Sequence, residues 1–153
     1  MLCRLSQSEL GLCSYVGTYR RRMAIHRKRS EPAGSVADPW GVDIEGACAE
    51  YVVARVKGVF WNALSDGDIS ALPDAGDLQI RHTPRLDGCL ILRPKDSTEA
   101  TFILVVGVAP EFRIVGQIRG SEARRDEFWQ APNNRPGAWF VPQSALSPIG
   151  GGR

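Results

Sequence analysis

The stretch 102-FILVVGVAPEFRIVGQI-118 does most to decide the fold class of this 153-residue chain. Residues 102–108 form an almost unbroken apolar run, which is typical of a central strand with both faces buried. Residues 112–118 alternate between apolar and mainly polar side chains, and this pattern predicts a further strand with one face on the core. The second half of the chain is therefore expected to hold a sheet.

Shorter strands are expected at residues 77–83, 89–92 and 139–141. In the first of them, Gln79 and Arg81 are two positions apart, so their side chains project from the same face of the sheet. Asp87-Gly88 is a turn signal that predicts a hairpin into the next strand. A short helix is expected over residues 121–129, followed by a loop over residues 130–137.

A long basic helix is expected over residues 6–29. Ser6 and Glu9 have the spacing of a capping box, in which each side chain bonds to the backbone of the other residue. The last turns carry a group of cations, which suit the negative end of the helix dipole. The group consists of Arg20, Arg21, Arg22, Arg27, Lys28 and Arg29. Proline, glycine and serine residues predict a linker over residues 30–40.

A second helix is expected over residues 43–57, with Asp43 as its N-cap. Its first half contains the small residues 46-GACA-49, which would let it approach a sheet or another chain closely. Residues 62–76 are rich in aspartate and glycine and predict a loop. Helices followed by strands favour an α+β fold, with a central mixed or antiparallel sheet of about four to five strands flanked by helices.

Charge is spread unevenly along the chain. Residues 1–30 carry seven Lys or Arg and one acid, a net charge of +6, whereas residues 31–153 carry twelve bases and sixteen acids, a net charge of −4. A basic segment of this kind suggests a polyanionic partner such as nucleic acid, although a solvated helix end would also explain it. We expect a basic helix and linker over residues 1–40, an α+β core over residues 41–148 and a disordered tail over residues 149–153.

Several classes of protein are disfavoured by what the sequence lacks. The longest apolar stretch, Phe102–Val106, is far shorter than the roughly 20 residues of a membrane helix, and no signal peptide is visible. The four cysteines have no metal-binding spacing, which favours buried thiols in a reducing cytosol. His26 and His82 are the only histidines, so a Ser–His or Cys–His mechanism has few options. We therefore expect a soluble cytoplasmic protein with no membrane partner.

Residues 73-PDAGDLQIR-81 hold the arrangement that most favours a chemical function. They place Asp74 in a loop before a strand, and Gln79 and Arg81 on one face of that strand. Glu50 lies upstream on the second helix. Carboxylate and amide oxygens are ligands for Mg²⁺, and a nearby cation can hold phosphate, so these residues would suit metal-assisted cleavage of a phosphodiester.

This arrangement resembles the PD-(D/E)xK nuclease superfamily, whose fold is that of restriction endonucleases. Pro73-Asp74 matches the Pro-Asp of that family literally, the helix glutamate of the family maps to Glu50, and its strand pair falls on Gln79 and Arg81. The chain also resembles small proteins encoded by phages or prophages, which share a PD-x-G-x-x-Q/E-V-R strand and a closing FVPQSAL segment. The resemblance covers roughly residues 41–148 and implies a nuclease-like core.

The resemblance implies a nucleic-acid-associated protein of a bacterial host cell that cleaves phosphodiesters with Mg²⁺ or Mn²⁺. Glu50, Asp74 and Gln79 would hold the metal ion, and Arg81 would hold the scissile phosphate. The basic residues 20–29 would dock the nucleic-acid backbone, DNA rather than RNA, and binding would weaken steeply with salt. A homodimer is compatible with this family.

Two departures from the family pattern keep an alternative open. Gln79 replaces a glutamate, which removes one negative charge from the metal site. Arg81 replaces a lysine and, because it is always protonated, cannot act as a base. These changes favour a catalytically degenerate nuclease-fold protein, such as an anti-defence factor that binds DNA or a host protein. A plain interaction module is a third hypothesis.

Structural explanations are also open for each of these residues. Asp74 could simply cap the turn before the strand. Asp77 also competes with Asp74 for the role of the acid, and the proline before Asp74 favours Asp74. Gln79 and Arg81 could be the solvent face of an edge strand, and Glu50 a solvated helix residue. The nuclease hypothesis requires the oxygens of Glu50, Asp74 and Gln79 to converge within reach of one metal ion.

Aromatic residues near the C-terminus support a different kind of contact. They are Trp129, Trp139 and Phe140, and Arg135 accompanies them. Aromatic and arginine side chains together can stack the bases of a single strand. The same residues could instead be core aromatics that close the sheet.

Overall fold

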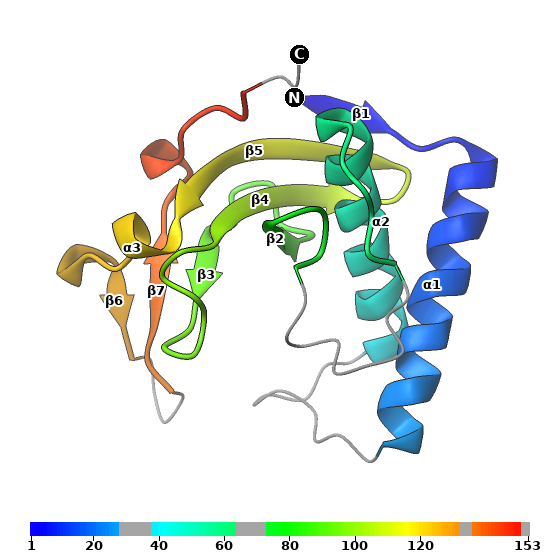
Figure 1. Ribbon diagram of the computed structural model, residues 1–153, viewed down its shortest axis with the longest axis horizontal. Helices are drawn as coiled ribbons and strands as arrows, with labels where there is room; N and C mark the ends of the chain where they lie inside the picture. The colour runs from blue at the N-terminus through cyan, green and yellow to red at the C-terminus, as the bar shows by residue number, and fades with distance from the viewer. Residues whose placement is uncertain (28–37, 64–72, 132–135, 151–153) are drawn as a thin grey trace.

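The computed structural model describes residues 1–27, 38–63, 73–131 and 136–150, which form an α+β fold (Figure 1). The two long helices are α1 (Gln7–His26) and α2 (Pro39–Lys57). The strands are β1 (Leu2–Arg4), β2 (Leu78–Thr83), β3 (Leu90–Leu92), β4 (Thr101–Val108), β5 (Glu111–Arg119), β6 (Trp129–Gln130) and β7 (Ala138–Val141). The short helical segments are α3 (Gly120–Ala123), η2 (Asp126–Phe128) and η3 (Gln143–Ala145).

These strands form two sheets. The four-stranded sheet has the order β1-β5-β4-β2, in which β2 runs parallel to β4 and the other neighbours are antiparallel. The three-stranded sheet has the order β3-β7-β6 and is antiparallel. The expected α+β class with a mixed sheet is confirmed, whereas the restriction-endonuclease-like fold stays a prediction. Strands β2 and β3 each lie at the edge of their sheet.

Strand β4 is the centre of the core because its two faces pack against different layers. Ile103 and Val105 belong to a buried cluster that includes residues of α1 and α2. Phe102, Leu104 and Val106 belong to a second buried cluster, which includes residues of β3 and β7. The expectation of a strand buried on both faces is therefore confirmed.

Helices α1 and α2 pack side by side on one side of the four-stranded sheet (Figure 1). The predicted capping box at the start of α1 is present, with Glu9 Oε2 accepting from the Ser6 backbone at 2.7 Å and Ser6 Oγ accepting from the Glu9 backbone at 3.3 Å. The predicted start of α2 at Asp43 is wrong. The helix begins at Pro39, because proline suits a first turn and Asp38 Oδ1 accepts from the Gly41 backbone at 2.9 Å.

The predicted helix over residues 121–129 is also wrong beyond Ala123. After the η2 turn, Trp129 enters β6 and pairs with Trp139 of β7, and the two rings meet edge to face at 4.7 Å between centroids. Strand β1, which pairs with β5, was not expected, because a strand of three residues is too short to show alternation. Cys3 of β1 and Val16 of α1 lie in the same buried cluster as α2.

Parts of several expected segments lie outside the described residues. They are residues 30–37 of the linker, 64–72 and 132–135 of two predicted loops, and 151–153 of the predicted tail. Within the described part of the chain, no helix combines the length and the apolar character needed to cross a membrane.

Candidate functional site

Glu50 is held in a fixed position between the two helices. It is the one polar or charged residue among the described residues that is buried, with 8% of its surface exposed. Both of its carboxylate oxygens accept from Arg20 of α1 at 2.7 Å, and Trp61 Nε1 donates to Oε2 at 3.0 Å. A two-pronged contact of this kind is the strongest form of an arginine–carboxylate pair. Glu50 is therefore not a solvated helix residue.

Arg20 also ties this pair to the chain that follows α2. Its Nε donates to the backbone oxygen of Ala63 at 3.1 Å, and one terminal nitrogen reaches the backbone oxygen of Asn62 at 3.4 Å. Asn62 in turn donates to the next part of the site, since its backbone N–H bonds to the Asp74 backbone oxygen at 3.1 Å. A single guanidinium thus connects α1, α2 and the segment that carries Asp74.

Asp74 lies along the free edge of β2. Its Oδ2 accepts from the Ile80 backbone N–H at 2.6 Å, and its own backbone N–H donates to the Leu78 oxygen at 2.9 Å. The proline before it and the Ala75–Leu78 bridge turn the chain back onto this edge. No donor among the described residues bonds to the other carboxylate oxygen, Oδ1. Asp74 does cap the edge, as the structural explanation requires, and it keeps one oxygen available.

Glu50 and Asp74 are electrostatically coupled. Burial, and after it the negative charge of Glu50, raise the pKa of Asp74 to about 6. The hydrogen bond from Ile80 and the positive charges of Arg81 and Arg20 oppose the rise in pKa without cancelling it. Glu50 and Asp74 are therefore within electrostatic range of one another, and the roles expected of them stay predictions. We call Glu50, Asp74 and Arg20 the carboxylate cluster.

Gln79 and Arg81 share the face of β2 that points away from α2, as expected from their spacing. Leu78 and Ile80, on the other face, belong to the core under the helices. Arg81 forms an ion pair with Asp96 at 3.1 Å, and its guanidinium lies 5.1 Å from the centroid of the Phe102 ring.

The predicted metal ligands do not all converge. Gln79 is half-buried, and within the described part of the chain its amide forms no hydrogen bond that would join it to Glu50 or Asp74. Of the four residues predicted to be catalytic, Glu50, Asp74 and Arg81 interact electrostatically, whereas Gln79 is placed beside them by its position on β2 alone.

The predicted basic docking segment is divided by the structure. Arg20 binds Glu50, and Arg21 lies 3.9 Å from Asp43, so these two side chains contact α2 and are only 15% and 14% exposed. Arg22 and Arg27 lie on the exposed surface. Lys28 and Arg29 lie outside the described residues. Sequence spacing alone does not reveal which cations of a basic helix turn toward a neighbouring helix.

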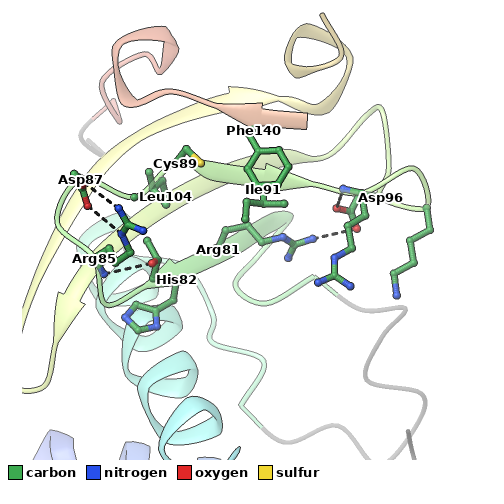
Figure 2. A pocket seen from close by; sticks show the side chains of 13 residues that line it. Arg81, His82, Arg85, Asp87, Cys89, Ile91, Asp96, Leu104 and Phe140 are labelled. Atoms are coloured by element: carbon green, nitrogen blue, oxygen red, sulfur yellow. Dashed lines mark hydrogen bonds and ion pairs between the residues drawn. The ribbon is translucent and has the colours of Figure 1, made fainter. Parts of the chain in front are cut away.

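A basic groove lies between the edge strands β2 and β3 (Figure 2). It has a volume of about 670 Å³. Its polar lining includes four cations and two acids: Arg81, Arg85, Arg93, Lys95, Asp87 and Asp96. Ile91, Leu104 and Phe140 supply apolar lining. Arg81 belongs both to this groove and to the electrostatic surroundings of Asp74.

This groove was not predicted from the sequence. Arg93 and Lys95 follow the short strand 90–92, and a pair of cations directly after a strand end was the available signal. Both residues are exposed, and no acidic partner contacts either side chain among the described residues. Arg85 is bonded to Asp87 through two contacts of 3.2 Å, so that pair brings no net charge.

The residues present fit a divalent cation only in part. Among the described residues, no three His, Cys, Asp or Glu side chains are grouped so that they could hold a metal ion. Asp74 offers a carboxylate oxygen, and Gln79 offers an amide oxygen on the same strand edge. Glu50 already accepts three hydrogen bonds from Arg20 and Trp61, so it fits as a neighbour of a metal ligand and not as a ligand.

Comparisons with protein-family models, with curated proteins and with solved structures each found no match to this chain. The functional interpretation therefore rests on the residues and their geometry.

Proposed function

We propose that the protein binds nucleic acid and hydrolyses its phosphodiester bonds with Mg²⁺ or Mn²⁺ at the carboxylate cluster. The observation that carries the proposal is the placement of Asp74 beside the charge of Glu50, with a pKa raised to about 6. Ionising a carboxyl in such surroundings is unfavourable, and perturbed carboxyls of this kind are enriched at functional sites. A bound cation would remove the penalty.

Asp74 and Gln79 are the residues that would hold the cation. Mg²⁺ in enzymes is often bound by one or two carboxylates together with substrate phosphates and water, so one open carboxylate suffices when the substrate brings its own oxygens. When bound, the metal would neutralise phosphate charge and activate a water molecule. The open Oδ1 of Asp74 supports this assignment.

Arg20 and Arg81 would have different tasks. Arg20 neutralises Glu50 and fixes it between the helices, so the remaining uncompensated charge at the cluster belongs to Asp74. Arg81 is always protonated, which suits it to bind a phosphate oxygen and prevents it from accepting a proton. Its side chain is 32% exposed, so a phosphate in the basic groove can reach it.

A catalytically degenerate protein is the second candidate, and one observation favours it. The Arg20 guanidinium already supplies Glu50 with the positive charge that a metal ion would supply. Together with Gln79 in place of an acid, this leaves the cluster with fewer metal ligands than the PD-(D/E)xK pattern implies. Such a protein would bind DNA, or a host protein, without cleaving it.

A cleavage assay with a matched control separates the two candidates. The purified full chain is incubated with plasmid, linear duplex, single-stranded DNA and RNA, with Mg²⁺ or Mn²⁺ and with EDTA. Asp74→Asn removes the open carboxylate, whereas Asp77→Asn removes an exposed acid from the same turn. Metal-dependent cleavage that is lost in Asp74→Asn and kept in Asp77→Asn supports hydrolysis.

The other outcomes are equally informative. Binding without cleavage supports the degenerate protein. Cleavage that survives Asp74→Asn points to a contaminating nuclease or to another site and contradicts the assignment. The absence of both binding and cleavage rules out both nucleic-acid functions.

A further inference from the structure

We propose that the basic groove between β2 and β3 binds a single strand of nucleic acid, with phosphates on Arg81, Arg93 and Lys95 and a base against Phe140. The inference rests on the proposed function only in taking nucleic acid as the ligand. It adds which form of nucleic acid the protein holds, and where.

The charges of the groove favour a phosphate-bearing ligand. Two of its four cations are bonded to acids, Arg81 to Asp96 and Arg85 to Asp87. Arg93 and Lys95 are exposed at the rim, with no acidic partner among the described residues. The net charge of the lining is therefore positive. The Oδ2 atom of Asp96 accepts from the Arg93 backbone N–H at 2.8 Å, and Asp96 forms its ion pair with Arg81.

Arg81 is preorganised to meet a phosphate. Its guanidinium lies over the Phe102 ring at 5.1 Å, bonds to Asp96 at 3.1 Å and points along the groove (Figure 2). A guanidinium fixed in this way loses little side-chain freedom when it binds an oxyanion, because its geometry is already set. Its ring-facing and Asp96-facing sides are occupied, and 32% of the side chain remains exposed.

The opposite wall of the groove is apolar and aromatic. The Phe140 ring of β7 lies over Ile91 of β3, and both face the strand that carries Arg81 (Figure 2). Ile91 is 38% exposed and Phe140 is half-buried, so the wall is available to a ligand. Arg81 on the β2 wall and Arg93 and Lys95 just after β3 therefore lie around an aromatic face, and cations beside an aromatic face are the combination that binds single strands.

This combination selects a single strand over a duplex. In a duplex the faces of the bases are stacked on one another, so Phe140 and Ile91 would have no base to contact. An acidic peptide would satisfy the cations but would leave the Phe140 face without a partner. Because Arg81 lies within the electrostatic surroundings of Asp74, a strand in the groove would pass beside the carboxylate cluster.

Fluorescence anisotropy in EDTA tests the groove without requiring cleavage. The probes are labelled oligo(dT), the same oligonucleotide annealed to its complement, and a labelled polyglutamate peptide. The groove variants are Arg93→Gln/Lys95→Gln and Phe140→Leu. The matched control is Arg4→Gln/Arg119→Gln, which removes two cations that are 71% and 54% exposed on other parts of the sheet. Circular dichroism verifies that each variant is folded.

Each groove variant has its own expected signature. Arg93→Gln/Lys95→Gln should weaken oligo(dT) binding and lower the slope of log K against log salt by about 1.4, since each phosphate contact on a single strand contributes about 0.7. Phe140→Leu should weaken binding roughly 5- to 150-fold, the range expected for loss of one stacked base, with an unchanged salt slope. The control pair should bind as the wild type does.

Three results would overturn the inference: equal or tighter binding of the duplex, unchanged oligo(dT) affinity in both groove variants, or polyglutamate binding as tight as that of oligo(dT). The last result would indicate a protein partner. Loss of oligo(dT) binding in the groove variants without any cleavage by the wild type would sustain the groove and refute hydrolysis. Cleavage by the wild type, together with normal oligo(dT) binding by the groove variants, would support hydrolysis and refute the groove.

Discussion

Replacing Asp74 with asparagine should stabilise the fold at neutral pH. Burial and the charge of Glu50 raise the pKa of the Asp74 carboxyl to about 6 in the folded protein, against 3.8 for an ordinary aspartate. Asparagine keeps an oxygen that can accept the Ile80 N–H and removes the charge that Glu50 repels. The difference between the two pKa values corresponds to about 3 kcal/mol of folding free energy when the carboxyl is fully ionised.

The pH dependence follows from the direction of this shift. The folded wild type binds the Asp74 proton more tightly than the unfolded chain does, so its stability falls as pH rises from about 4 to about 6 and then levels off. The asparagine variant has no such proton. Its advantage over the wild type should be close to zero near pH 4 and complete above pH 6 to 7.

Urea denaturation over this pH range measures the difference directly. For a chain of this length, about 3 kcal/mol corresponds to a rise in Tm of roughly 6–12 °C. Other groups also titrate, and Glu9 in particular has its pKa lowered to about 2 by the Ser6 backbone hydrogen bond and by Arg55. Such groups are common to both proteins, so they cancel when the variant is compared with the wild type. Asp77→Asn, at an exposed position, serves as the control.

Two results would refute this reasoning. If Asp74→Asn is less stable than the wild type at pH 7, the carboxylate is a favourable structural cap and not a strained site. If the advantage of the variant grows toward low pH, the pKa is lowered in the fold, and the repulsion from Glu50 is not what governs it.

Three further predictions concern the same core. Arg20→Gln should lower the unfolding free energy by about 3–5 kcal/mol in urea denaturation, because it leaves Glu50 buried without its cation; a loss below about 1 kcal/mol would mean that water replaces the guanidinium. Gly17→Ala should destabilise the fold by about 1–3 kcal/mol, because an added Cβ would lie 2.5 Å from Ile44 Cα. An unchanged Tm would show that the helices separate freely to make room for the methyl group. Mg²⁺ should raise the Tm of the wild type more than that of Asp74→Asn, and equal shifts would place the metal elsewhere.

Strand β4 shows why much of the fold was predictable. A strand that must pack on two layers can have no polar face, so its composition reports its position directly. The limits of the helices were harder to predict. Asp38 and Asp43 are both acceptable caps, and the choice between them depends on Pro39, which suits the first turn. Competition between equivalent local signals is settled by the neighbouring residues.

Close approach of the helices was also only partly predictable. The small residues 46–49 were expected to let α2 approach a sheet or another chain closely, and Ala47, Cys48 and Ala49 are fully buried. Gly46, however, has open space around it, whereas a Cβ added at Gly17 of α1 would lie 2.5 Å from Ile44 Cα, so the helices approach closely there. A helix contact requires a small residue on one side only, and sequence pattern does not show which helix supplies it.

The candidate site divides in the same way. Pro73-Asp74 and the spacing of Gln79 and Arg81 were visible locally, and the structure places them on one strand edge. The Arg20–Glu50 pair joins residues 30 positions apart on different helices. No local pattern shows which of the six cations of segment 20–29 turns toward Glu50 of α2. The basic groove was missed because its walls come from two sheets whose edges meet only in the folded chain.

The carboxylate cluster poses a question that packing alone does not answer. Arg20 satisfies Glu50 with two hydrogen bonds, and this pair alone would be a complete structural unit. Asp74 then adds a second acid. When this acid is ionised, the fold is less stable than it would be with asparagine at this position, although asparagine could accept the same hydrogen bond from Ile80. A purely structural role would not require the charge. The charge would have a physical use if a cation were bound during part of the protein's cycle, and a phosphate held by Arg81 in the basic groove would bring its counterions beside Asp74.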